Sequence, residues 1–273
     1  MAEPMSKPAS VDKDRIEQII EAENSHLAPD CEVGLVITTY NRPHYLARTL
    51  RSLAASSLEK TALVIIDDGS QSRRTLDLIR TFSLPGVPIT KILRKRRARS
   101  FNDIGFPVAL RFRKRAKGFG VHDCLRIAWR YLLDRTPCSY LANLDSDTLV
   151  RPLWLSEILR LHREQRARRG PIIVTGYNSC KHPIRRDLGD HREKESIGGV
   201  NVLFEADLFD SFIAPNLRYE EPLQTGWDWL VVRAAERKGY PLLCTKPSVV
   251  QHIGRVGRFS FFVQFDQALD FDG

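Results

Sequence analysis

Two aspartates separated by one residue are the part of this sequence best suited to chemistry. Asp145 and Asp147 directly follow the apolar run 140–144, which predicts a buried strand. Side chains two residues apart on extended backbone point the same way, so both carboxylates can converge on one cation. Carboxylate oxygens suit Mg²⁺ or Mn²⁺, cations that neutralise a diphosphate. Asp-x-Asp also occurs in ordinary turns, so its meaning depends on the surrounding elements.

The segments around these aspartates alternate between strand and helix patterns. Strands are predicted at 33–38, 62–66, 85–93, 140–144, 171–176 and 197–204, and helices at 44–54, 75–82, 121–133, 152–168, 205–212 and 228–238. This order predicts an α/β protein with a mainly parallel sheet flanked by helices on both faces. Ligands of such sheets bind beyond the carboxyl ends of the strands, where Thr38, Asp68 and the two aspartates fall. Residues 178–196 are expected to form a long charged loop.

The length of 273 residues allows one large domain. We expect a disordered or short helical N-terminal segment over 1–30, with a helix at Asp12–Ala22, then the α/β domain over 31–260 and a C-terminal tail over 261–273. No leader pattern and no run of about eighteen apolar residues is present, which predicts a cytoplasmic protein. The five cysteines lack paired spacing and are expected to be reduced thiols.

The formal charge of +9 raises the question of an anionic partner. Basic residues are concentrated at 91–117 and at 163–169. Three interpretations stay open at this point: a solvated basic face, a patch for an anionic acceptor or an anionic lipid surface, and a nucleic-acid-binding surface. The third is disfavoured because no helix-turn-helix, RNP or zinc-finger pattern occurs.

Four motifs stand in a recognisable order along the chain. They are VITTYNR at 36–42, VIIDDGS at 64–70, LDSD at 144–147 and GWDW at 226–229. In this order and spacing, over roughly residues 33 to 255, the chain resembles the GT-A glycosyltransferases of family 2. The absence of GxGxxG after the first strand disfavours a dinucleotide-binding protein. The resemblance implies a Rossmann-like GT-A fold and transfer of a sugar, with inversion, from a nucleoside-diphosphate donor to a hydroxyl acceptor.

The resemblance also implies which residues hold the donor. Thr38, Tyr40, Arg42 and Asp68 would surround the nucleobase. A carboxylate can accept the imide N–H of uracil, so Asp68 mildly favours a UDP-sugar; a simple turn is the alternative for its motif. Gly199 would line the donor-sugar pocket, where a missing side chain lets backbone approach the ligand, unless it only marks a strand bulge.

By the same resemblance, Asp147 ligates Mn²⁺ or Mg²⁺, and Asp145 contacts ribose or the metal. Such a metal stabilises the leaving diphosphate as a Lewis acid. His252 is the expected third ligand, with a purely structural histidine as the alternative. Arg255 and Arg258 either close over the diphosphate or belong to an exposed loop.

The general base is expected to be Asp228, at the start of the last predicted helix, where family 2 enzymes carry the carboxylate that deprotonates the acceptor. Helix capping is the alternative role. Glu220 and Glu221 lie close upstream and could also offer a carboxylate. Trp227 or Trp229 stacks on a sugar or is buried in the core.

Some features depart from the family pattern, which leaves the acceptor open. Thr38 stands where proline is common, 121–123 reads Val-His-Asp where Arg-Asn is frequent, and the basic stretch 91–117 lengthens the chain between the second and third motifs. His122, Asp123 and Asp103 could contact substrate or serve as caps and surface residues. A carbohydrate or lipid-linked acceptor, with peripheral contact to an anionic inner membrane face, would fit cell-surface polysaccharide or glycolipid synthesis. A non-catalytic nucleotide-sugar-binding relative is the remaining alternative.

Overall fold

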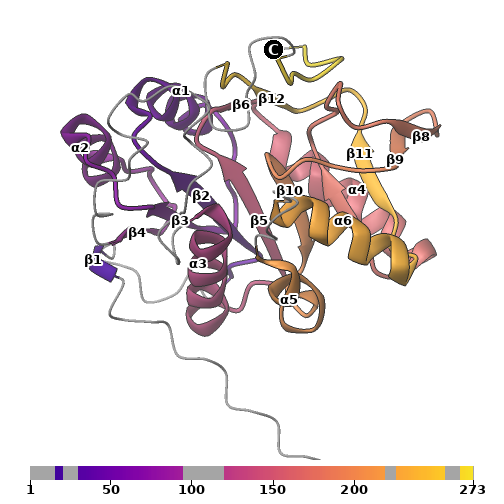
Figure 1. Ribbon diagram of the computed structural model, residues 1–273, viewed down its shortest axis with the longest axis horizontal. Helices are drawn as coiled ribbons and strands as arrows, with labels where there is room; N and C mark the ends of the chain where they lie inside the picture. Colours follow the sequence, from indigo (N-terminus) through magenta and orange to yellow (C-terminus); the bar gives the residue numbers. More distant parts are fainter. Residues whose placement is uncertain (1–15, 21–29, 95–119, 219–225, 256–264, 273) are drawn as a thin grey trace, which may run out of the picture.

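The computed structural model describes residues 16–20, 30–94, 120–218, 226–255 and 265–272. A ten-stranded sheet crosses its centre (Figure 1). In spatial order the strands are β1 (Ile16–Ile20), β4 (Ile89–Arg94), β3 (Thr61–Asp67), β2 (Val33–Thr39), β5 (Tyr140–Asp145), β10 (Asn201–Glu205), β7 (Ile173–Thr175), β11 (Leu242–Thr245), β9 (His191–Lys194) and β8 (Ile184–Asp187). All of these run in one direction except β1, β9 and β10. The expected α/β fold with a mostly parallel sheet is confirmed.

Helices cover both faces of this sheet (Figure 1). On one face lie α1 (Pro43–Ala54), α2 (Arg73–Thr81) and α4 (Trp154–Arg169); on the other lie α3 (Val121–Arg135), the π-helical turn η4 (Phe209–Ile213), α5 (Ala214–Asn216) and α6 (Trp227–Lys238). Each face of the sheet therefore has its own hydrophobic core: the first lies under α1, α2 and α4, and the second under α3, η4 and α6. In strand β2, Leu35 and Ile37 pack in the first core and Val36 packs in the second. A strand buried on both faces has to be apolar throughout.

The helix predicted at Asp12–Ala22 is wrong where the structure describes it. Residues Ile16–Ile20 form β1, which pairs antiparallel with β4 at the edge of the sheet. Ile20 packs against the first hydrophobic core. Isoleucine favours strands, and pairing with β4 supplies backbone hydrogen bonds that a short isolated helix would have to make alone.

The loop predicted at 178–196 is also wrong in part, because it contains the β8–β9 hairpin. The charged side chains of β9 are buried and take their partners from distant segments. Lys194 Nζ donates to Asn178 Oδ1 at 2.7 Å, and Arg192 Nη1 donates to Asp270 Oδ2 at 2.6 Å. Buried charges need such partners, and a local sequence pattern does not reveal them.

The second basic stretch, 163–169, is largely neutralised within the fold. Three of its four arginines pair with carboxylates of other elements: Arg163 with Glu32, Arg166 with Glu205, and Arg169 with Glu193. This arrangement favours a structural role for that stretch over an anion-binding patch. Of the first basic stretch, residues 95–117 lie outside the described ranges.

Three further expectations concern the fold. The five cysteines, all in described parts of the chain, form no disulfide. Within the described residues, no helix combines the length and apolar character needed to cross a membrane. The helix predicted at 205–212 begins later than expected, because β10 and a turn come first and the helical elements η4 and α5 follow.

His162 lies on α4 and is fully buried, with its ring edge-on to Tyr140 at a centroid distance of 5.1 Å. Burial, aided by the charge of Arg166, lowers the pKa of His162 to about 4. In the unfolded chain the pKa of this histidine is about 6.5, so the unfolded chain binds a proton at a higher pH than the folded protein does. Stability from the neutral ring is present above that pH and is lost as the pH falls, by about 2 kcal/mol at pH 5.

Urea unfolding at pH 7.5 and pH 5 measures this loss. In His162→Phe, which keeps an aromatic ring against Tyr140, the decrease in unfolding free energy between the two pH values should be smaller by about 2 kcal/mol. An equal decrease in both proteins would show that His162 does not carry the effect.

Candidate active site

The register of three neighbouring strands brings the sequence motifs to one edge of the sheet. Thr38 at the end of β2 pairs with Asp145 at the end of β5, and Thr39 pairs with Asp67 at the end of β3. These strands are parallel, so their carboxyl ends and the polar residues that follow them share one edge (Figure 1). The sheet therefore brings together the strand ends from which the site was predicted.

Asp147 lies at the centre of the site. Its Oδ2 accepts from His252 Nε2 at 3.2 Å and also from Arg42 Nη1. Burial alone would raise the pKa of Asp147, but the contacts and charges of His252 and Arg42 hold it below the usual value. The carboxylate is thus kept ionised in a buried position.

A small second sheet places the histidine. Strand β6 (Thr148–Val150) pairs with β12 (Val250–His252), with His252 opposite Thr148. The backbone N–H of Ile253 donates to the Asp147 carbonyl at 2.8 Å. The sequence predicted His252 at the site, and this pairing explains how a residue so far along the chain reaches Asp147.

His252 is held from both sides of its ring. Nδ1 lies 2.9 Å from the backbone oxygen of Asp266, and because a carbonyl can only accept, Nδ1 carries a proton; Nε2 carries a second proton, which it donates to Asp147. The ring also stacks on Phe265 at a centroid distance of 5.6 Å. Burial lowers the pKa of His252, but Asp147 outweighs this and the net direction is upward. A metal-ligating histidine typically has its second nitrogen anchored in this way.

Gly254 leaves no room for a side chain above this pair. A Cβ at this position would lie 1.9 Å from Asp147 Oδ2 and 2.8 Å from His252 Nε2. The backbone therefore passes directly over the two polar atoms, which only glycine permits. Sequence analysis did not give Gly254 a role, although a glycine two residues after a candidate ligand was a signal for a close approach.

Asp145 belongs to the same electrostatic unit. Burial and the charge of Asp147 raise its pKa well above the usual value, while His252 and Arg42 partly oppose this rise. Two carboxylates and an imidazole form a donor set that suits Mn²⁺ or Mg²⁺. Within the described residues, however, no three such side chains converge into a ready-made metal cluster. What the structure presents is the Asp147–His252 pair with Asp145 close enough to interact electrostatically.

The two aspartates of the turn at 67–70, which reads DDGS, make different contacts. Asp67 builds the turn, since its Oδ2 accepts from the backbone N–H of Ser70 at 2.7 Å and Gly69 adopts a φ of +79°. Asp68 instead accepts from Arg94 Nη1 at 3.0 Å. Sequence analysis missed Arg94, which is fully buried at the end of β4; its place at a strand end was the available signal.

Asn41 ties the first motif to this turn. Its side-chain Oδ1 accepts from the backbone N–H groups of Gln71 at 2.8 Å and Ser72 at 2.9 Å. The backbone N–H of Asn41 donates to Ser70 Oγ at 2.8 Å. Asn41 has a φ of +47°, a conformation that asparagine tolerates better than most residues. The loop that carries Tyr40 and Arg42 is thereby fixed beside Asp68.

Asp228 lies in the first turn of α6, and its Oδ2 accepts from the backbone N–H of Gly199 at 3.2 Å. A Cβ on Gly199 would come within 3.3 Å of the Asp228 Cβ and 2.9 Å of Trp227 Cζ2. Burial raises the pKa of Asp228; backbone hydrogen bonds oppose this rise and the charge of Asp266 adds to it. A buried carboxylate with a raised pKa suits a general base.

A buried asparagine fixes the other side of Gly199. Asn143 Nδ2 donates to the Gly199 carbonyl at 2.7 Å, and Asn143 Oδ1 accepts from the Val202 N–H at 2.9 Å. Asn143 is the lone polar residue inside the apolar run before Asp145. That interruption was the signal that sequence analysis did not use.

The two tryptophans beside Asp228 differ in burial, which bears on whether each packs in the core or could stack on a sugar. Trp227 is buried in the core, edge-on to Trp129 at 6.2 Å between ring centroids. Trp229 is 43% exposed and lies 5.4 Å from the ring of His182. Only Trp229 therefore remains a candidate for contact with substrate.

The other candidates are placed as follows. Arg255 lies with its guanidinium over Phe265, 5.6 Å from the ring centroid. Asp123 contacts Arg126 within the first turns of α3. Four further candidates lie outside the described residues: Asp103, Glu220, Glu221 and Arg258.

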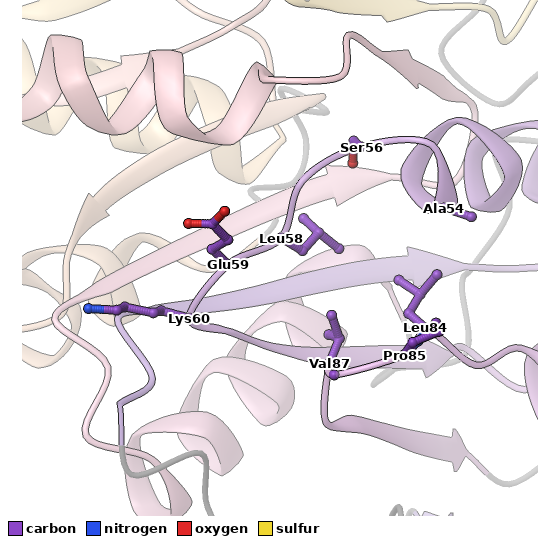
Figure 2. Close-up of a pocket in the computed structure, with 9 residues that line it drawn as sticks. Ala54, Ser56, Leu58, Glu59, Lys60, Leu84, Pro85 and Val87 are labelled. Carbon is purple, nitrogen blue, oxygen red and sulfur yellow. The ribbon is translucent and has the colours of Figure 1, made fainter.

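A separate hollow of about 290 Å³ lies at the opposite end of the sheet. Its lining comes from the end of α1 and from the loops that precede β3 and β4, and includes Leu58, Lys60 and Val87 (Figure 2). Because it lies near the starts of strands whose ends carry the motifs, it is not part of the candidate site.

The sheet order, the Asp-x-Asp at the end of a central strand and the carboxylate at the start of α6 define a protein of the GT-A class. Residues 35–196 match the family model described as Glycosyl transferase family 2, which is more than half of the chain. The chain therefore belongs to glycosyl transferase family 2, as the motifs suggested.

Among solved structures, the crystal structure of S. aureus TarS is similar, with a TM-score of 0.50 at 13% sequence identity. The likeness covers 80% of this chain and 36% of that chain, so this chain spans about a third of the length of TarS. At this identity the likeness shows the fold alone. No curated protein matches the sequence.

Proposed function

We propose that this chain is a metal-dependent inverting glycosyltransferase that moves a sugar from a nucleoside-diphosphate donor to a hydroxyl acceptor. The observation that carries the proposal is the meeting of separate motifs in one electrostatic unit. The charges of Asp147, His252 and Asp228 all act on the buried carboxyl of Asp145. A site that combines a cation-binding pair with a candidate base suits the departure of a diphosphate and the activation of a hydroxyl.

In the proposed reaction, the acceptor hydroxyl oxygen attacks the anomeric carbon of the donor sugar and gives its proton to Asp228. The bond from that carbon to the diphosphate oxygen breaks, and its electron pair leaves with the diphosphate. One displacement without a covalent sugar intermediate inverts the anomeric configuration. Gly199 orients the Asp228 carboxylate through its N–H.

Asp147 and His252, together with Asp145, would hold the cation. A bound Mn²⁺ or Mg²⁺ would supply Lewis-acid stabilisation of the leaving diphosphate. The anchored ring of His252 and the ionised carboxylate of Asp147 support this assignment, because Nε2 and Oδ2 lie 3.2 Å apart and the cation would replace the proton that Nε2 now donates to Asp147.

For the donor we favour a UDP-sugar. Asp68 is oriented by its ion pair with the buried Arg94, and an ionised carboxylate accepts the imide N–H of uracil. Thr38, Tyr40 and Arg42 are on the adjacent loop and strand end, so the proposed nucleobase site is at the β2 and β3 end of the sheet edge.

The acceptor we propose is a carbohydrate or a lipid-linked molecule. The exposed indole of Trp229, next to Asp228 in sequence, offers a surface for a sugar ring. Cytoplasmic residence, peripheral contact with an anionic inner membrane face, and a role in cell-surface polysaccharide or glycolipid synthesis are parts of the proposal that rest on the sequence. The family assignment and the acidic site disfavour a nucleic-acid-binding protein.

Calorimetric titration of the full chain with UDP, GDP and CDP, each with and without Mn²⁺, tests the donor class. We expect UDP to bind most tightly, and we expect EDTA to remove that binding. Tighter binding of GDP or CDP would reassign the nucleobase. If the folded protein bound none of the three nucleotides, the proposal of a nucleotide-sugar enzyme would be overturned.

A further inference from the structure

We propose that the Arg42 guanidinium occupies the cation position at Asp147 until a donor diphosphate draws the guanidinium away. Donor and metal would then each raise the affinity of the other. Arg42 is then a positioning residue as well as part of the donor site. This inference rests on the proposed function, because it assigns to Asp147 the role of a metal ligand.

The contact itself is the first observation. Arg42 Nη1 donates to Oδ2 of Asp147, the same oxygen that accepts from His252 Nε2 at 3.2 Å. One carboxylate oxygen therefore carries two nitrogen donors, one of them permanently cationic. Arg42 has to leave this oxygen before a divalent cation can use it fully.

The second observation is that Arg42 is the neighbour best able to move. His252 is fixed by the Asp266 carbonyl and by Phe265, and the Gly254 backbone has no side chain to turn. The Arg42 side chain is 28% exposed, whereas that of Asp147 is 6% exposed. A partly exposed arginine can change rotamer without disturbing the core.

The surroundings of Arg42 keep its backbone still while its guanidinium pivots. Arg42 directly precedes α1, and Asn41 fastens the loop to the backbone of Gln71 and Ser72. The guanidinium also lies over the ring of Tyr45, 4.8 Å from its centroid. A diphosphate at the sheet edge would offer Arg42 a pair of oxygens that its planar guanidinium can contact at once.

Two ligands that favour the same displaced state of Arg42 must strengthen each other. Diphosphate binds more tightly when Arg42 turns toward it, and the divalent cation binds more tightly when Arg42 releases Asp147 Oδ2. By linkage, each should raise the affinity of the other by the same factor. Without diphosphate, the competition with Arg42 should weaken cation binding by about tenfold or more, the usual worth of a charged hydrogen bond.

The test is a Mn²⁺ titration of the full chain, followed by the electron paramagnetic resonance signal of free Mn²⁺, with and without UDP. Arg42→Met should bind Mn²⁺ alone about tenfold more tightly than the wild type. The gain in Mn²⁺ affinity caused by UDP should shrink in this variant, and Arg42→Lys should restore part of the wild-type behaviour. Arg48→Met, which removes an exposed positive charge from α1, the helix that Arg42 precedes, should leave Mn²⁺ affinity near the wild-type value.

The sign of the effect separates this inference from a structural role, because damage to the fold would weaken Mn²⁺ binding. If Arg42→Met bound Mn²⁺ no more tightly than the wild type, or if Arg48→Met gained as much, the inference would be overturned. UDP-dependent Mn²⁺ binding by the wild type would in that case still support the proposed function. If the wild type bound no Mn²⁺ even with UDP, the metal role and this inference would fail together.

Discussion

Replacing Asp228 with asparagine should lower the rate of sugar transfer by about two to four orders of magnitude, the usual worth of a positioned base. Asparagine has nearly the same shape and can still accept from the Gly199 N–H, but it cannot take the acceptor proton. UDP and Mn²⁺ affinities should therefore stay near those of the wild type. Single-turnover transfer rates and calorimetric donor titrations measure the two effects separately.

Asp134→Asn is the matched control, because Asp134 is an exposed aspartate on α3 away from the sheet edge. It should transfer sugar at the wild-type rate. Substantial turnover by Asp228→Asn would move the base elsewhere, and Glu220 and Glu221 would then be the next carboxylates to substitute.

The pH dependence of transfer reports on the same residue. Asp228 works as a base only when it is ionised, and burial raises its pKa above the ordinary value of about 3.9. The rate should therefore fall as the pH drops through this raised pKa, at a higher pH than an exposed aspartate would give. This limb of the profile should be absent from the residual activity of Asp228→Asn.

The sequence predicted the strands that carry the site because their signals are local. The strands β2, β3 and β5 are apolar runs that end in polar motifs, and parallel pairing then places those ends together. The same local reasoning failed for β1, whose short segment becomes a strand through its pairing with β4. It also failed for β9, whose buried charges depend on Asn178 and Asp270.

The supporting residues of the site were missed for a related reason. Arg94 and Asn143 act through partners in other strands, Asp68 and Gly199 respectively. Asp266 anchors His252 through its backbone carbonyl, so its side-chain type gave no indication of this contact. Residue types identify groups that can do chemistry, whereas the groups that orient them are determined by tertiary contacts.

Replacing Asp147 with alanine should abolish the Mn²⁺-dependent part of donor binding. The substitution removes the carboxylate that His252 and Arg42 both contact, and an imidazole with one remaining carboxylate holds a hard cation weakly. Calorimetric titration with UDP, with and without Mn²⁺, measures the loss. Asp77→Ala, which removes an aspartate from the exposed Arg73–Asp77 pair on α2, should keep the full Mn²⁺ dependence, and melting temperatures would confirm that both variants fold.

The ion pair between Arg42 and Asp147 makes this prediction sharper than a simple loss of function. If the pair were only structural, removal of either partner would weaken the site in the same direction. The assignment of Asp147 as a ligand and Arg42 as its competitor requires opposite signs for Mn²⁺ binding without nucleotide: weaker in Asp147→Ala and tighter in Arg42→Met. An Asp147→Ala protein with an unchanged Mn²⁺ titration would remove Asp147 from the metal site, and the cation would then have to be held elsewhere along this edge of the sheet.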